Sequence, residues 1–427
     1  MNDQPEIKIS VRGLSKVFGA NPRRALEMRD AGMKRPEIFE KTGQTLGLSN
    51  INFDVHDGEL LVIMGLSGSG KSTLIRCLNR LIEPTEGQIL IDGEDITRLG
   101  EKDLLEARRR HFSMVFQNFA LFPHRTVLQN AQFGLEIRGV DKAQRRRAAL
   151  EALEQVGLKG WEDAWPHQLS GGMQQRVGLA RALANDGSVL LMDEAFSALD
   201  PLIRKDMQQE LQELQFHTQK TTIFITHDLD EALNIGDRII LLKDGEIVQQ
   251  GTPEDILRHP ADDYVARFIE GVDKARVLTA SNAMRPVRAT ARESDGPRTV
   301  LHKMRESGID SIYITSRDRR LLGLVEAAAV NRAVKRGDDH IRDLVDPDVP
   351  VTGPDEPLSA LYGMFSPRSV PIAVVDEDRR LLGVVVKGAV LDELAKAGEP
   401  ATEDDDGTPK IIPDETPAPL AVTEGVQ

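Results

Sequence analysis

Cysteine is nearly absent from this sequence, since Cys77 is the only one among 427 residues. A single thiol cannot form an intramolecular disulfide, which excludes a disulfide-stapled scaffold and favours a reducing compartment. Long apolar runs are missing too, because no stretch approaches the roughly 18 residues that a membrane-spanning helix requires. Residues 1–10 are polar and acidic, without the apolar segment of a signal peptide. We therefore expect a chain that neither crosses a membrane nor is exported.

Positive charge is in deficit. The chain has 54 basic and 68 acidic side chains and a net charge of −14. Proteins that coat nucleic acid gain affinity by neutralising phosphates, so this balance argues against such a partner. The chain is long enough for several domains. Its 427 residues correspond to roughly three domains of about 150 residues each, and every one can bury a core.

The first 275 residues alternate apolar strand patterns with helical patterns, which is typical of an α/β nucleotide-binding fold. We expect strands at 7–11, 59–64, 189–192 and 222–225, a helix at 71–81, and a hairpin at 239–248 that turns at Asp244-Gly245. A polar segment rich in Arg and Glu, residues 21–41, interrupts the early strands with helical patches on either side of Pro36. We interpret it as an insertion whose role the sequence does not reveal.

The C-terminal third contains a repeat. Residues 312–323 match residues 372–383, and both end in Asp-Arg-Arg-Leu-Leu-Gly. Each copy reads as strand, charged turn, strand and helix, and a lone copy would leave a sheet face bare, so we expect the two to pack together. The predicted units are a connector at 276–297, a repeat pair at 298–398 divided into 298–340 and 341–398, and an acidic disordered tail at 399–427.

A phosphate-binding loop is the strongest chemical motif. The sequence GLSGSGKS at 65–72 follows an apolar strand and precedes a helix, as this motif requires. Glycines allow backbone N–H groups to surround phosphates, Lys71 reaches the outer phosphates, and the Ser72 hydroxyl can ligate Mg²⁺. The predicted contacts to ATP in this loop are Gly65, Ser67, Gly68, Ser69, Gly70, Lys71, Ser72 and Thr73.

Two carboxylates end a second apolar strand, in VLLMDE at 189–194. Asp193 is suited to the Mg²⁺ shell, and Glu194 to polarising a water for in-line attack on the γ-phosphate. Alone, such a pair is more often a solvated strand end. Together with the phosphate loop it predicts ATP hydrolysis.

Residues 169–176, LSGGMQQR, resemble the signature of ATP-binding cassette (ABC) ATPases and precede the acidic pair as in that family. Ser170, Gly171 and Gly172 open a predicted helix whose free N–H groups can hold a γ-phosphate. In the family these residues contact ATP held by the opposite protomer. The resemblance therefore implies a head-to-tail homodimer with two ATP molecules between its subunits.

Other cassette motifs follow in the family's order. Gln117 resembles the Q-loop glutamine that senses Mg²⁺ and the attacking water, and His227 resembles the switch histidine. Phe18 resembles the aromatic residue that stacks on adenine, and Asp200 ends a segment similar to the D-loop. The resemblance implies catalytic roles for Glu194, His227, Gln117 and Lys71, and metal contacts from Ser72, Gln117 and Asp193. It also implies a P-loop NTPase cassette fold at 1–275, with a RecA-like core, an antiparallel β subdomain and a helical subdomain.

The resemblance narrows when the motifs at 65–72, 78–85 and 193–204 are joined with the insertion and the repeat. Together they look like the ATP-binding subunit of glycine betaine/L-proline importers, over about residues 6–398. This implies import of a small zwitterion, transmembrane permease subunits, and an extracytoplasmic substrate-binding protein or domain. It also implies a peripheral location on the cytoplasmic face of the inner membrane. In such proteins the apolar stretch at 119–123 lines a groove for a permease coupling helix, the alternative being a buried loop.

In that family the repeat is an α+β tandem pair of CBS motifs, which act as regulatory modules. Nucleotide-binding CBS motifs usually carry Ser or Thr, followed three residues later by Asp. By our alignment the corresponding residues are Glu326 and Ala329 in the first copy, and Val386 and Ala389 in the second. This departure argues against adenosine binding, and leaves ionic strength, a nucleotide or a lipid as the signal that gates transport.

Three alternatives stay open at this point. The chain could serve another importer, for methionine or polar amino acids. It could be a soluble cassette ATPase acting on nucleic acid or ribosomes, although such proteins usually carry two cassettes and this chain has one phosphate loop. It could also be a ligand-sensing CBS protein with a vestigial ATPase, which the presence of Lys71, Asp193, Glu194 and His227 disfavours.

Overall fold

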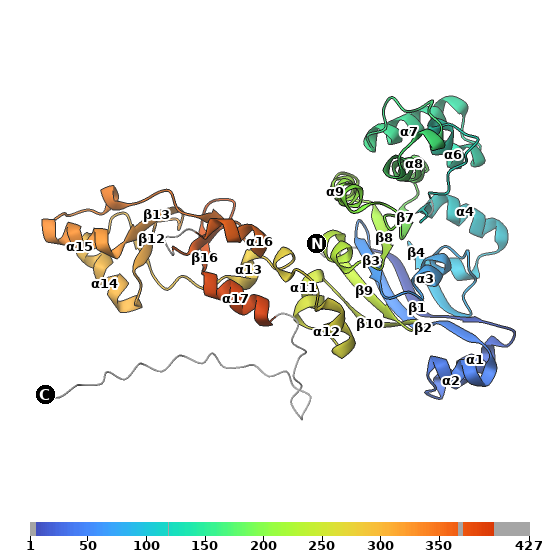
Figure 1. Cartoon of the computed structure of the whole chain (residues 1–427), viewed down its shortest axis with the longest axis horizontal. Coiled ribbons are helices and arrows are strands. Elements are labelled where there is room, and N and C mark those ends of the chain that lie inside the picture. Colours follow the sequence, from blue (N-terminus) through green and yellow to red (C-terminus); the bar gives the residue numbers. More distant parts are fainter. Residues whose placement is uncertain (1–5, 118, 366–369, 397–427) are drawn as a thin grey trace.

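The computed structural model describes residues 6–117, 119–365 and 370–396. Figure 1 shows them as an N-terminal part, coloured blue to yellow, and an orange to red C-terminal part beside it. We refer to these as the cassette and the C-terminal module. No helix in the described ranges is long and apolar enough to span a bilayer.

A six-stranded sheet forms the centre of the cassette, in the order β10-β9-β3-β8-β7-β6. All neighbouring strands are parallel except β9 and β10, which form the predicted hairpin. The strands are rich in Val, Ile and Leu, as a sheet covered on both faces requires. Their bounds are β3 (Leu60–Met64), β6 (Phe112–Val115), β7 (Val189–Asp193), β8 (Thr221–Thr226), β9 (Arg238–Lys243) and β10 (Glu246–Gly251).

An antiparallel sheet in the order β2-β1-β4-β5 packs beside this core. One apolar cluster joins the two sheets through α3, since it contains Ile9 and Ile89 from the second sheet, Leu74 from α3, and Leu61 and Ile223 from the first. The bounds are β1 (Ile7–Phe18), β2 (Thr45–His56), β4 (Glu86–Ile91), β5 (Glu94–Asp95) and α3 (Lys71–Leu78). We expected α3 to reach residue 81. It ends earlier because Arg80 adopts a positive φ of 53° that a helix does not allow.

Helices cover the sheet and extend from it. A second cluster of buried side chains joins α5, α7, α8 and α9 to β3, β7 and β8. The helices of the cassette after α3 are α4 (Glu101–His111), α5 (Val127–Ala131), α6 (Phe133–Ile137), α7 (Lys142–Gln155), α8 (Gly171–Ala184), α9 (Pro201–Thr218), α10 (Leu229–Ile235), α11 (Pro253–Arg258) and α12 (Asp263–Ile269). Short 3-10 helices lie at Ile96–Arg98 and Pro166–Gln168 in the cassette, at Lys274–Arg276, and at Arg342–Leu344 and Tyr362–Met364 in the module.

The segment between β1 and β2 forms two helices, α1 (Pro22–Asp30) and α2 (Arg35–Thr42). We call residues 21–43 the insertion. The expectation that its helical patches lie on either side of Pro36 was wrong: the break is at residues 31–34, and Pro36 lies in the first turn of α2. Proline is tolerated there because the N–H group it lacks has no partner within the helix.

The C-terminal module contains two three-stranded sheets of the same topology, β11-β12-β13 and β14-β15-β16. In each, the first pair is parallel and the second antiparallel, which confirms the predicted duplication. Side chains of β12 and β13 pack against those of β15 and β16, as expected. The bounds are α13 (Ala280–Ala283), β11 (Thr290–Arg292), α14 (Pro297–Ser307), β12 (Ser311–Thr315), β13 (Leu321–Glu326), α15 (Ala327–Arg336), β14 (Val351–Thr352), α16 (Leu358–Leu361), β15 (Ile372–Val375), β16 (Leu381–Val385) and α17 (Lys387–Lys396).

Residues 276–297, which we interpreted as a connector, contain α13 and β11. Ala280 and Ala283 of α13 lie in the core of the second repeat, and β11 joins the sheet of the first. Elements of three or four residues are too short to show a period in the sequence, so the module begins earlier than composition indicates. The acidic tail at 399–427 lies outside the described residues.

Polar contacts connect the module to the cassette. Arg258 of α11 forms an ion pair of 2.7 Å with Glu393 of α17, and the Asn282 side chain donates a hydrogen bond of 2.5 Å to Glu254 of α11. Both contacts use one short helix of the cassette, α11, which lies beside the module in Figure 1.

Cys77 provides a test of the packing around α3. Its side chain is fully buried in the cluster between the two sheets, and burial raises the pKa of the thiol to about 12. We expect no reaction with a disulfide reagent such as DTNB at pH 8 in the native protein, and one equivalent after unfolding in guanidinium chloride. A Glu37→Cys variant, which places a thiol on the exposed face of α2, is the positive control. Rapid labelling of native wild-type protein would contradict the packing.

Candidate functional site

Four loops carry the predicted chemical residues, and each follows the carboxyl end of a core strand. The phosphate loop follows β3, Gln117 follows β6, Glu194 follows β7 and His227 follows β8. Since these strands are parallel neighbours, their carboxyl ends meet at one edge of the sheet, where α/β proteins bind ligands.

The phosphate loop depends on its glycines. Gly65 has a φ of 150°, and a Cβ atom there would lie 2.2 Å from the carbonyl oxygen of Leu242, so only glycine fits. Lys71 starts α3 and is buried, with Nζ donating to the carbonyl oxygens of Gly65 at 2.8 Å and Leu66 at 3.1 Å. Burial lowers the pKa of Lys71, while the charges of Glu194 and Asp193 act in the opposite direction. The loop thus holds a desolvated cation among backbone dipoles.

Ser72 and Asp193 lie side by side below the loop. The Ser72 hydroxyl donates to Oδ1 of Asp193 at 3.2 Å, and Arg76 approaches Oδ2 at 3.6 Å. Asp193 is 5% exposed. A hydroxyl and a carboxylate are hard oxygen donors of the kind that Mg²⁺ prefers, so these two residues fit a metal that bridges protein and phosphates.

Glu194 is the point on which the other predicted residues converge. Nε2 of Gln117 donates to Oε2 of Glu194 at 3.1 Å, and Nδ1 of His227 lies 3.5 Å from the same oxygen. Glu194 has a positive φ of 47°, which is strained for a residue with a Cβ atom. Three hydrogen bonds hold its backbone there: its N–H donates to the Ile225 carbonyl, and its own carbonyl accepts from both the N–H and the hydroxyl of Ser197.

A buried carboxylate fixes the strand end that carries His227. Glu231 of α10 accepts a hydrogen bond from the Thr226 hydroxyl and another from Gln208, at 3.0 Å. Burial raises the pKa of Glu231, and the two donors act in the opposite direction. His227 is itself half exposed and so depends on these neighbours for its position.

Arg204 of α9 links the D-loop to the same strand end. Its guanidinium donates to the carbonyl oxygens of Ser197 and Leu199, at 3.4 and 3.2 Å, and to Asp228 at 3.3 Å. Asp228 directly follows His227 and caps α10. One side chain therefore connects the D-loop to the residue that follows the histidine.

A cavity of about 370 Å³ opens above the phosphate loop. The ring of Phe18, 41% exposed, forms one wall. Gly47 permits this, because a Cβ atom there would lie 2.8 Å from Cε2 of Phe18. The lining residues are Phe18, Arg35, Thr45, Gly47, Ser67, Gly68, Gly70, Lys71, Ser72, Thr73 and Glu194.

Not every predicted ligand residue lines this cavity. Gly65 and Ser69 lie in the phosphate loop but are buried beneath it. Three signature residues, Ser170, Gly171 and Gly172, lie at the start of α8 and line no part of it, and neither does Asp200. Ser170 and Asp200 cap α8 and α9, accepting from the N–H groups of Met173 at 3.3 Å and Ile203 at 3.1 Å.

Three lining residues were missed by the sequence analysis: Arg35, Thr45 and Gly47. Thr45 and Gly47 follow no local motif, because β2 reaches the cavity only through its pairing with β1. Arg35 belongs to the insertion, and its only signal was the high arginine content of that segment.

The apolar loop after Gln117 is held against the cassette. Arg181 of α8 donates to the carbonyl oxygens of Phe119 and Ala120, at 3.1 and 2.6 Å, and both residues have a positive φ. Phe119 and Leu121 pack, partly buried, on the main core cluster. For Phe119 and Leu121, this packing supports the alternative that residues 119–123 form a buried loop rather than a groove for a coupling helix.

A second cavity, of about 860 Å³, lies in the C-terminal module. It includes Glu326 and Ala329, the first-copy positions at which a nucleotide-binding CBS motif carries a hydroxyl and Asp, together with Asp346 and Asp348. Carboxylates repel phosphate, so the lining also argues against an adenine nucleotide.

Comparison with known proteins finds a family match in the cassette and another in the C-terminal module. The ABC transporter family profile matches residues 48–197, and the CBS domain profile matches residues 341–396. The glycine betaine/carnitine transport ATP-binding protein GbuA of Listeria monocytogenes serotype 1/2a (strain 10403S) is 53% identical over 388 residues, covering 91% of this chain and 98% of the relative.

Two further relatives extend the comparison. The glycine betaine/proline betaine transport system ATP-binding protein ProV of Escherichia coli (strain K12) is 46% identical over 395 residues, covering 92% of this chain and 98% of the relative. Among solved structures, cbiO1 from Clostridium perfringens, described as part of the ABC transporter complex cbiONQ, has a TM-score of 0.50 and 27% identity. That alignment covers 62% of this chain and 95% of cbiO1.

Glu231 gives a pH-dependent prediction. An acid whose pKa is raised by folding binds its proton more tightly in the native state, so its unfavourable effect on stability fades as the pH falls towards its ordinary value of 4.5. We expect the free energy of unfolding of the wild type, relative to Glu231→Gln, to increase from pH 8 to pH 5. Urea denaturation of both proteins measures it. The control is Glu213→Gln on the exposed face of α9. A difference independent of pH would contradict the assignment.

Proposed function

The chain belongs to the ATP-binding subunits of ABC transporters, and on that premise we propose that it hydrolyses ATP to power import of a small zwitterion of the glycine betaine type. The observation that carries the catalytic part is the convergence of Gln117 and His227 on Glu194, beside the phosphate loop. The solute is proposed from the relatives named for betaine transport, because this chain supplies the ATPase and not the transport pathway.

ATP fits the cavity in one orientation. The backbone N–H groups of residues 65–73 and the charge of Lys71 suit the phosphates, and the exposed face of Phe18 suits adenine stacking. Ser72 and Asp193 would hold Mg²⁺ next to the outer phosphates, with Gln117 as a third candidate ligand. When bound, the ion neutralises charge that develops on the transferred phosphoryl group.

Glu194 is the proposed general base. Its Oε2 already accepts a hydrogen bond from Gln117, and it can take a proton from a water aligned with the γ-phosphate. Nδ1 of His227 lies 3.5 Å from the same oxygen, and the imidazole can donate to the γ-phosphate. Together they orient the water and stabilise the charge that attack creates.

The signature residues point to a second subunit. Ser170 and Gly171 are exposed at the start of a 14-residue helix, away from the cavity of their own chain. The N-terminus of a helix attracts phosphate, so these residues can complete the site of a partner. We infer a head-to-tail homodimer that closes on two ATP molecules and transmits closure through the Gln117 loop to permease subunits.

The remaining assignments follow from this scheme. The cassette, at about residues 1–275, lies on the cytoplasmic face of the membrane as a peripheral subunit, and an extracytoplasmic substrate-binding protein or domain delivers the solute. The C-terminal module acts as a gate, supported by its contacts with α11. The curated relatives named here do not favour a methionine or polar amino acid importer.

Replacing the proposed base gives a direct test. Glu194→Gln removes the proton acceptor while keeping the shape of the side chain, so we expect kcat to fall about 10²- to 10⁴-fold with ATP binding retained. Steady-state phosphate release and equilibrium nucleotide binding measure the two effects. Glu213→Gln, which removes one exposed carboxylate from α9, should leave both unchanged. Wild-type turnover in Glu194→Gln would exclude this residue as the base.

The solute is tested in cells. Uptake of labelled glycine betaine after an osmotic upshift should collapse when the intact gene is replaced by the Glu194→Gln version, because transport requires hydrolysis. Immunoblotting shows whether both versions are present at equal levels. Equal uptake would refute the betaine assignment, and labelled methionine or polar amino acids would then be tested in the same cells.

A further inference from the structure

We propose that Arg35 of the insertion is a nucleotide-binding residue whose guanidinium contacts the phosphate chain of ATP. This inference rests on the function proposed above and adds a residue to the same site. Arg35 is the first residue of α2 and lines the cavity above the phosphate loop together with Phe18, Ser67 and Gly68.

Charge is the first argument. Among the residues that line this cavity, Arg35 and Lys71 are the cations, and Glu194 is the anion. A triphosphate carries several negative charges, and Arg35 adds a second side-chain cation beside Lys71 in this cavity. A guanidinium offers a planar pair of donors that matches two phosphate oxygens, which makes arginine a frequent phosphate ligand.

The present contacts of Arg35 are weak enough to be exchanged. Its guanidinium donates to the Gly68 carbonyl at 3.3 Å, and lies 3.9 Å from the carboxylate of Asp244, which is 72% exposed. The Arg35 side chain is 27% exposed, and an ion pair at that distance with an exposed partner contributes little to stability. Arg35 therefore sits beside the phosphate-binding backbone, and a bound phosphate would be a stronger partner than either present contact.

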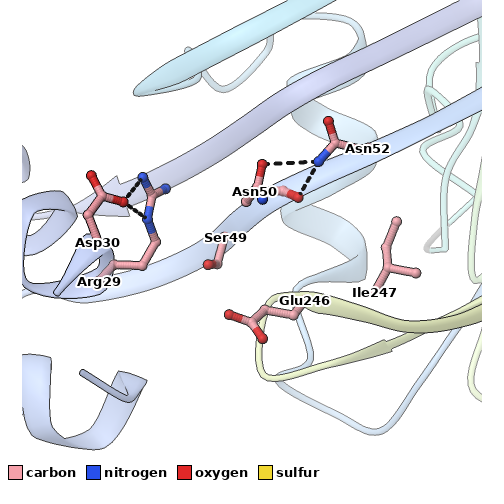
Figure 2. A pocket seen from close by; sticks show the side chains of 7 residues that line it. All are labelled: Arg29, Asp30, Ser49, Asn50, Asn52, Glu246 and Ile247. Atoms are coloured by element: carbon pink, nitrogen blue, oxygen red, sulfur yellow. Dashed lines mark hydrogen bonds and ion pairs between the residues drawn. The ribbon is translucent and has the colours of Figure 1, made fainter. Parts of the chain in front are cut away.

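The insertion is anchored well enough to position this side chain. Arg29 of α1, 16% exposed, donates to the Ser15 hydroxyl at 2.7 Å and to Glu86 at 2.5 Å, both on the antiparallel sheet. Its guanidinium also pairs with Asp30, as Figure 2 shows at the rim of a polar cavity shared with Asn50 and Glu246.

An apolar contact fixes the second helix. Ile38 of α2 and Ala25 of α1 are fully buried against Val17 and Leu46, at the ends of β1 and β2. Val17 directly precedes Phe18, so the helix that carries Arg35 packs on the strand that carries the proposed adenine contact. The packing of the insertion on the antiparallel sheet thus places Arg35 in the lining of the nucleotide cavity.

Binding of ATP, ADP and AMP to full-length protein tests the proposal, by competition against a fluorescent ATP analogue. For Arg35→Ala we expect ATP affinity to fall about 3- to 30-fold, ADP affinity to fall less, and AMP affinity to change little, since the lost bond is to the phosphate chain. Arg35→Lys should recover part of the loss. In turnover, KM for ATP should rise while kcat changes less than twofold.

The matched control is Arg24→Ala, which removes an exposed arginine from α1 of the same insertion and should bind all three nucleotides as the wild type does. Thermal unfolding verifies that each variant folds, and Arg35→Gln replaces Arg35→Ala if the latter does not. Unchanged ATP affinity, or an equal loss for all three nucleotides, would overturn the proposal. If the wild type bound no nucleotide, the proposed function itself would fail instead.

Discussion

The register of three parallel strands is the constraint on which the site depends. Met64 of β3 pairs with Thr226 of β8, and Asp193 of β7 pairs with Ile225. The strands therefore end at one level, and the phosphate loop, the acidic pair and the histidine leave the sheet together. A shift of one residue would turn each strand's side chains to the opposite face, and Ser72 would no longer reach Asp193. Hydrophobic burial on both faces maintains this register.

At the carboxyl edge of the central sheet, a strained backbone conformation is held by neighbouring hydrogen bonds. Glu194 holds a backbone conformation that costs about 1–3 kcal/mol for a residue of its type, and such a conformation persists only where neighbours enforce it. Ser197 and Ile225 supply that enforcement through backbone hydrogen bonds, and Arg204 joins the D-loop to the residue after His227. The carboxylate proposed as the base is thus positioned by elements that, in the proposed dimer, face a second subunit.

The β9–β10 hairpin adjoins both additions to the basic cassette. At its turn, Gly245 donates to the Ser69 carbonyl of the phosphate loop at 2.9 Å, and Asp244 faces Arg35 of the insertion. At its other end β10 leads into α11, whose Glu254 and Arg258 contact the C-terminal module. The insertion and the module therefore approach opposite ends of one hairpin, and the turn of that hairpin contacts the phosphate loop.

Chemistry that depends on neighbouring residues in the chain could be predicted before the structure was known. The phosphate loop, the acidic pair and the signature are read from adjacent residues, because their backbone N–H groups and side chains act within a few positions of one another. The repeat could also be recognised from neighbouring residues, since both copies contain the contiguous sequence Asp-Arg-Arg-Leu-Leu-Gly. Strand positions could be predicted from apolar runs. The ends of α3 and of the insertion helices differed from the prediction, because the conformation of single residues such as Arg80 and Pro36 sets where a helix begins or ends.

Which distant residues share a cavity depends on packing between elements, and no local pattern predicts it. Thr45 and Gly47 reach the nucleotide site because β2 pairs with β1 beside Phe18, and nothing in their own neighbourhood indicates it. Arg35 reaches it because α2 is packed on Val17 and Leu46, a contact between segments that no local pattern connects. Local sequence specifies the chemistry that a residue can perform. Packing between elements far apart in the chain specifies which site, and therefore which ligand, that residue can contact.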